Sequence, residues 1–199
     1  MSFKILGVRI EISFLLITML TLFSFYDKSG IALCAFFAAM LHESGHIIAA
    51  AICSCGIYEL AFKPFGIRMK LKKPLALTPT GRKIFILSAG CIVNVICFVS
   101  FCVFSRKITD TALIHLITAI FNLLPAGTLD GGRILYELLS IKMGQDRAEI
   151  LCDVISLVFA AALFIFGSFV LVKTGYNLSL IVTATYLFIM VIARQKKLK

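Results

Sequence analysis

The sequence predicts an all-α polytopic membrane protein, with six transmembrane segments and one short β-hairpin-like element on the cytoplasmic side. Hydrophobic residues make up 60% of the 199 residues and charged residues only 15%, and the mean hydropathy is +1.02. Soluble domains carry far more charge. Apolar runs as long as a bilayer-spanning helix, which needs about 20 residues, recur along the chain and are separated by basic segments.

Two apolar runs come first. The first, residues 5–26, lacks the small-residue cleavage site of a signal peptide, so we expect it to stay in the membrane as a helix. The second span is predicted at residues 31–55. No repeat, low-complexity tract or long polar linker follows, and residues 1–199 are therefore predicted to form a single membrane domain.

The hairpin is predicted in the longest polar interval, Gly56 to Gly81. Here Ile67, Met69 and Leu71 alternate with basic residues in the two-residue period of a strand, and prolines flank the stretch. An exposed strand edge could take up an extended peptide by main-chain hydrogen bonding. The basic loop could equally lie on anionic lipid headgroups, and the sequence leaves both interpretations open.

The remaining spans are predicted at residues 84–104, 111–124, 150–172 and 178–193. The run 111–124 would extend only about 21 Å as a helix. It leads into a Gly/Pro-rich stretch, residues 125–132, which we expect to be irregular. Irregular backbone at membrane depth requires surrounding protein or a water-filled cavity.

The distribution of Lys and Arg predicts the orientation, because these residues accumulate on the cytoplasmic side. With the amino terminus inside, all but four of the 20 basic residues are cytoplasmic, and both termini face the cytoplasm. The exceptions are Lys28, Arg106, Lys107 and Lys173. The net charge of +10 therefore flanks apolar spans and is not interleaved with aromatic residues, which excludes nucleic acid as the expected partner.

A polar cluster, HESGH, lies inside the second apolar run. His42 and His46 would share one helix face a single turn apart, so that two imidazoles could bind one metal ion. Glu43 lies about 100° around the helix, near enough to hydrogen-bond a water on that ion. This is the H-E-x-x-H arrangement of zinc peptidases. Polar groups in membrane helices can instead pair with neighbouring helices or line a transport path.

A catalytic zinc keeps three protein ligands and one open position, so the cluster lacks a ligand. Asp130 is the favoured candidate, because it would reach a similar depth within the Gly/Pro-rich stretch. Asp153, Glu137 and Glu149 compete with it, although each could pair with a nearby arginine. His115 is a poorer candidate because it begins the fourth segment near the external face, where an interfacial or helix-pairing role is expected.

HESGH and the later NLLPAGTLDGG together resemble the site-2 protease family, peptidase family M50, of intramembrane zinc metalloproteases. The resemblance implies a site-2 protease-like core and one Zn²⁺ per chain, with Asp130 as third ligand. Asn122, Pro125 and Gly131 match the rest of the family's N-x-x-P-x-x-x-x-D-G pattern. SAGCIVN is similar to the family's A-G-P-x-x-N, with Asn94 retained and Cys91 in place of proline.

The function implied is cleavage of a membrane-associated or membrane-tethered protein, with Glu43 as the general base for a zinc-activated water. Asn122 is a candidate hydrogen-bond donor to substrate backbone or oxyanion, or it could brace the loop at Pro125. Gly45 could let a substrate strand or a neighbouring helix approach closely, or be a packing glycine. Asn94, Pro125 and Gly131 are expected to shape the site or bind substrate.

The KPFGIRM stretch, the short first span and the missing PDZ insertion look like the stage IV sporulation protein FB branch of the family. That branch implies the bacterial cell membrane, a sigma factor precursor whose prosequence is removed, and regulatory membrane proteins. Because about six residues follow the last predicted span, no CBS domain is expected. A membrane transporter or channel, using His42, His46 and Asp130 as an ion-coupling site, is the alternative from another class.

Overall fold

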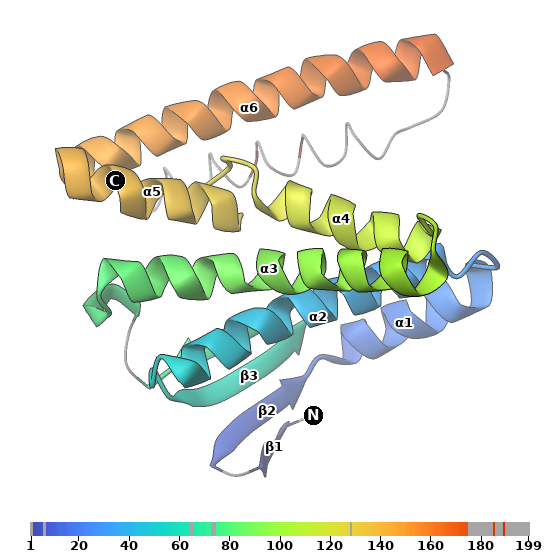
Figure 1. Ribbon diagram of the computed structural model, residues 1–199, viewed down its shortest axis with the longest axis horizontal. Helices are drawn as coiled ribbons and strands as arrows, with labels where there is room; N and C mark the ends of the chain where they lie inside the picture. The colour runs from blue at the N-terminus through green and yellow to red at the C-terminus, as the bar shows by residue number, and fades with distance from the viewer. Residues whose placement is uncertain are drawn as a thin grey trace. The chain divides into compact units, whose positions relative to one another are not determined.

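The computed structural model describes residues 2–5, 7–63, 66–72, 75–127 and 129–174, together with residues 185 and 189. The chain divides into two compact units, Met1–Phe121 and Asn122–Lys199. The first runs from blue to green in Figure 1, and the second contains the yellow and orange helices. The predicted sixth span, residues 178–193, lies outside the described residues apart from positions 185 and 189.

The first unit begins with two strands, where the sequence predicted the start of a helix. Strands β1 (Ser2–Ile5) and β2 (Val8–Ile12) pair antiparallel, and α1 covers only Phe14–Tyr26. The predicted helix over 5–26 is therefore corrected in its first part. The segment VRIEI alternates apolar and charged side chains, which suits a half-buried strand and not a membrane helix.

A four-stranded sheet of order β1-β2-β3-β4 forms at this end of the first unit. Strands β3 (Ile57–Lys63) and β4 (Gly66–Leu71) are antiparallel, which confirms the predicted hairpin. Strands β2 and β3 are parallel, and α1 and the following helix α2 (Ile31–Ile52) make the crossover that such a pair needs. The all-α class is thus corrected to a mostly helical fold with a small sheet.

An ion pair joins the two strands of the hairpin. Glu59 and Lys70 are directly opposite in register, and Lys70 Nζ lies 2.7 Å from Glu59 Oε1. The hydrogen bond from Lys70 lowers the pKa of the Glu59 carboxyl and raises the pKa of the Lys70 ammonium. Opposite charges on facing positions favour this register.

Helices α2 and α3 (Thr80–Ser105) form the core of the first unit and lie side by side (Figure 1). Small residues such as Ala38, Ala49 and Ala89 are buried, and small residues let membrane helices approach closely. Large apolar residues remain exposed along both helices, as expected of surfaces that face lipid. The 3₁₀ helix η1 (Leu75–Leu77) precedes α3, and α4 (Asp110–Asn122) follows it.

The second unit contains α5 (Asp130–Met143) and α6 (Gln145–Thr174), which pack on one another. The stretch predicted to be irregular to residue 132 ends earlier, because α5 begins at Asp130. Glycine content suggested a loop there, but Gly131 and Gly132 lie in the first turn of the helix. The backbone N–H of Gly127 donates to Ser156 Oγ on α6 over 2.8 Å, which ties the preceding loop to the long helix.

Three described helices are long and apolar enough to cross a membrane, within Ile31–Ile52, Thr80–Ser105 and Gln145–Lys173. They correspond to the second, third and fifth predicted spans. Helices α1 and α4 are apolar but have only 13 residues each, about 20 Å of helix. The described residues thus contain three candidate membrane spans in a mostly helical fold, while six spans stay a prediction.

Candidate metal centre

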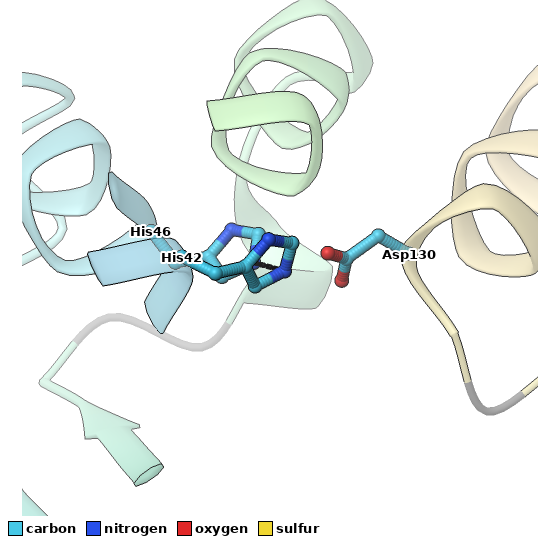
Figure 2. A group of neighbouring side chains, drawn as sticks. All are labelled: His42, His46 and Asp130. Carbon is cyan, nitrogen blue, oxygen red and sulfur yellow. Dashed lines mark hydrogen bonds between the residues drawn. The ribbon is translucent and has the colours of Figure 1, made fainter. Parts of the chain in front are cut away.

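His42 and His46 face one another on the buried side of α2. Their side chains are 4% and 9% exposed, and the rings meet edge to face with centroids 4.8 Å apart. The two Nε2 atoms are 3.1 Å apart, as the dashed line in Figure 2 marks. The i, i+4 spacing on a helix brings two nitrogen atoms to one point between the rings.

This pair fits a metal ion. Two nitrogen ligands at 2.0–2.1 Å from a tetrahedral zinc are about 3.3 Å apart, close to the observed separation. His46 Nδ1 lies 2.7 Å from the carbonyl oxygen of Ile86. Because a carbonyl only accepts, His46 must carry its proton on Nδ1, which leaves Nε2 available as a ligand.

Glycine on α3 makes room for both imidazoles. A Cβ atom at Gly90 would lie 2.6 Å from His46 Nε2 and 2.7 Å from His42 Nε2. Gly45 on α2 lies equally close to α3, because an added Cβ would lie 2.7 Å from the carbonyl oxygen of Ala89. Gly45 is therefore in contact with α3. Sequence reasoning missed Gly90, although it lies in the SAGCIVN segment.

The close approach of α3 to the histidines can be tested by substitution. Gly90→Ala should displace both imidazoles and lower zinc affinity about 10- to 100-fold, the usual effect of disturbing the groups around a metal ligand. The matched control is Gly81→Ala on the same helix, where an added Cβ meets nothing within 4 Å. Zinc content by elemental analysis, with folding checked by circular dichroism, measures the difference. Equal zinc in both variants would contradict the assigned contact.

Asn94 and His115 extend the site away from α2. Asn94 is completely buried, and its Nδ2 lies 3.4 Å from His42 Nδ1. Its Oδ1 lies 3.0 Å from His115 Nδ1. His115 is 3% exposed and stacks on Phe101 with centroids 5.6 Å apart. Of the two roles expected for His115, the structure shows helix pairing.

Glu43 and Asn122 are both half-buried. Glu43 follows His42 on α2, and Asn122 is the last residue of α4. The sequence singled out Glu43 because it lies beside His42, and Asn122 because it opens the Gly/Pro-rich stretch. Their catalytic roles stay predictions.

Asp130 is the first residue of α5 and is 8% exposed. The two glycines after it let the loop fold back on the helix, because a Cβ at Gly131 would collide with the carbonyl of Leu123 and one at Gly132 with that of Ala126. The carbonyl of Pro125 accepts a hydrogen bond from Ser156 over 3.4 Å. Gly131 is thus needed for the close contact with the loop that precedes Asp130, while a loop-shaping role of Pro125 stays a prediction.

The carboxylates that compete with Asp130 lie further along the same unit. Asp153 is buried on α6, whereas Glu137 on α5 and Glu149 on α6 are half-buried. His42, His46 and Asp130, the three metal ligands that the sequence predicted, are all buried. Figure 2 draws these three side chains, the histidines from α2 and the aspartate from the start of α5.

Two comparisons with known proteins found similarities. Residues 104–166 match the family model described as Peptidase family M50. The fold is similar to that of "Site-2 Protease from Methanocaldococcus jannaschii", with a TM-score of 0.68 and 24% identity over 97% of this chain and 94% of that chain. No curated protein sequence matches the chain. The resemblance to the site-2 protease family is confirmed, while the sporulation branch stays a prediction.

Proposed function

We propose that this chain is an intramembrane zinc metalloprotease that cleaves a membrane-associated or membrane-tethered protein. The observation that carries the proposal is the HESGH segment on a buried apolar helix, with the two Nε2 atoms 3.1 Å apart. The M50 match and the site-2 protease fold support a metalloprotease. The long apolar helices support a membrane location.

In this proposal His42, His46 and Asp130 hold one Zn²⁺ per chain. Two imidazoles and one carboxylate form a ligand set known from catalytic zinc sites, which leaves a position for water or substrate. A zinc ion bound there would lower the pKa of its water toward about 7 and polarise the scissile carbonyl. All three candidate ligands are buried, so bulk water would compete little with them.

Glu43 is proposed as the general base. Its carboxylate would accept a proton from the water as the new C–O bond forms, and would then donate that proton to the nitrogen of the leaving amine as the peptide C–N bond breaks. Asn122 would donate a hydrogen bond from its amide to the developing oxyanion or to the substrate backbone. Neither residue needs to bind the metal for these roles.

The proposed substrate and regulatory partners follow from the likeness to the sporulation branch. A cytoplasm-facing site would suit removal of the prosequence from a sigma factor precursor, and regulatory membrane proteins would then control access. These assignments depend on the likeness of KPFGIRM to the sporulation branch. The site-2 protease fold favours a protease over the alternative of a transporter or channel that uses the same three residues for ion coupling.

Metal removal tests the proposal. Purified protein in detergent should contain about one zinc per chain and cleave a membrane-tethered precursor. A strong chelator should abolish cleavage, and added zinc should restore it, because bound water is not activated without the metal. Elemental analysis and immunoblotting measure the two quantities. Metal-free protein that cleaves at full rate in chelator would refute the proposal.

A further inference from the structure

The histidine pair belongs to a longer chain of hydrogen bonds that crosses three helices. From the carbonyl of Ile86 on α3 it passes through His46 and His42 on α2, returns to Asn94 on α3 and ends at His115 on α4. The last three side chains are each at most 4% exposed. Buried polar groups in such chains are constrained by one another, because each N–H needs an acceptor.

The place of each proton can be worked out for the case in which His42 and His46 share a proton. His46 carries its proton on Nδ1, since Ile86 offers only a carbonyl. His46 Nε2 must then accept, and His42 donates to it from Nε2. His42 Nδ1 consequently accepts from the Asn94 amide nitrogen. Asn94 Oδ1 in turn accepts from Nδ1–H of His115.

A shared metal ion requires a different arrangement at His42. A ligand nitrogen cannot carry a proton, so His42 would bind through Nε2 and move its own proton to Nδ1. That N–H needs an acceptor, as metal-bound histidines generally have. Asn94 supplies one when its amide turns so that Oδ1 faces His42. Its Nδ2 then donates to His115 Nδ1, and His115 carries its proton on Nε2.

We propose that Asn94 and His115 are positioning residues for the metal ligand His42, and that the Asn94 amide turns over when a metal ion replaces the proton shared by the two histidines. Asparagine suits this position because it can donate at one end and accept at the other in either orientation. Histidine suits position 115 because its Nδ1 can donate or accept. The inference rests on the proposed metal site.

Zinc affinity tests the positioning role. Competition with a chelator of known affinity should give about 10- to 100-fold weaker binding for Asn94→Leu, which has similar volume but no acceptor. Asn94→Asp offers a carboxylate to His42 Nδ1–H and should stay within tenfold of the unmodified protein. Cys97→Ala, one turn further along α3, is the matched control and should bind normally. Circular dichroism before zinc addition checks that each variant folds.

The amide turn has a spectroscopic signature, since the chain contains only three histidines. In protein labelled with ¹⁵N-histidine, zinc should move the His115 proton from Nδ1 to Nε2. The Nδ1 chemical shift should then become that of an unprotonated ring nitrogen, and the Nε2 shift that of a protonated one. In the Asn94→Leu variant, zinc should not change the His115 nitrogen chemical shifts. An unchanged His115 spectrum in the unmodified protein would overturn the amide turn.

The outcomes separate this inference from the proposed function. If the unmodified protein binds no zinc, the proposed function fails. If it binds zinc and Asn94→Leu binds equally tightly, or Asn94→Asp is as weak as Asn94→Leu, the positioning role is overturned while the metal site stands.

Discussion

Glu43→Gln should abolish proteolysis while leaving zinc bound. Glutamine keeps the size and hydrogen-bonding reach of the side chain but cannot accept a proton, so only the general-base step is lost. Such steps contribute about 10²- to 10⁴-fold to rate, and we expect a loss of at least about 100-fold. Cleavage of a membrane-tethered precursor by detergent-purified protein, followed by immunoblot, measures it.

The control for this experiment is Glu137→Gln on α5, a half-buried glutamate in the polar part of the second unit. It should cleave at the normal rate. Zinc content should be the same in both variants and in the unmodified protein, because Glu43 is not a proposed ligand. Near-normal cleavage by Glu43→Gln would remove the general-base role, and loss of zinc from it would make Glu43 a ligand.

Asp130→Ala should lower bound zinc by at least about tenfold, because it removes one of three proposed ligands. Asp130 also lies in the first turn of α5, where a carboxylate stabilises a helix. Asp130→Asn therefore serves as a second variant, since it retains a polar side chain but is a poorer zinc ligand. Elemental analysis of purified protein measures the loss of zinc, and a thermal unfolding curve measures any loss of stability from the changed helix terminus.

Asp153→Ala is the matched control, because Asp153 is equally buried in the same unit. It should keep its zinc. The reverse result, with zinc lost from the Asp153 variant and retained in both Asp130 variants, would move the third ligand from α5 to α6. Loss from all of them would indicate that the fold of the second unit, and not a ligand, had been damaged.

Sequence reasoning recovered the elements whose signal is local. Long apolar runs predicted α2, α3 and most of α6, and two-residue alternation predicted the β3–β4 hairpin. The same alternation in VRIEI was overlooked, because hydropathy averaged over residues 5–26 conceals a short strand beside an apolar helix. One of its two partners in the sheet is β3, more than 40 residues later, and such distant pairing has no local signature.

In the candidate site, too, the sequence predicted local contacts but not contacts between distant segments. The i, i+4 histidines were visible in the sequence because one helix turn brings them together. The contact between Asn94 and His115 joins different helices across 21 positions, so His115 was assigned by depth alone. Gly90 was overlooked for a related reason, since a glycine in an apolar helix does not reveal which side chains pack against it. Asp130 was placed in a loop because its two glycines suggested one.

The parallel pairing of β2 with β3 also has a consequence for synthesis. β2 emerges from the ribosome before residues 13–56, and the strand that completes its hydrogen bonds follows only after them. At ordinary translation rates the delay is on the order of several seconds. In the predicted topology, α1 and α2 would insert and return during that time, so that the two strands meet on one face of the bilayer. On that topology, correct insertion of this helical pair is a condition for closing the sheet.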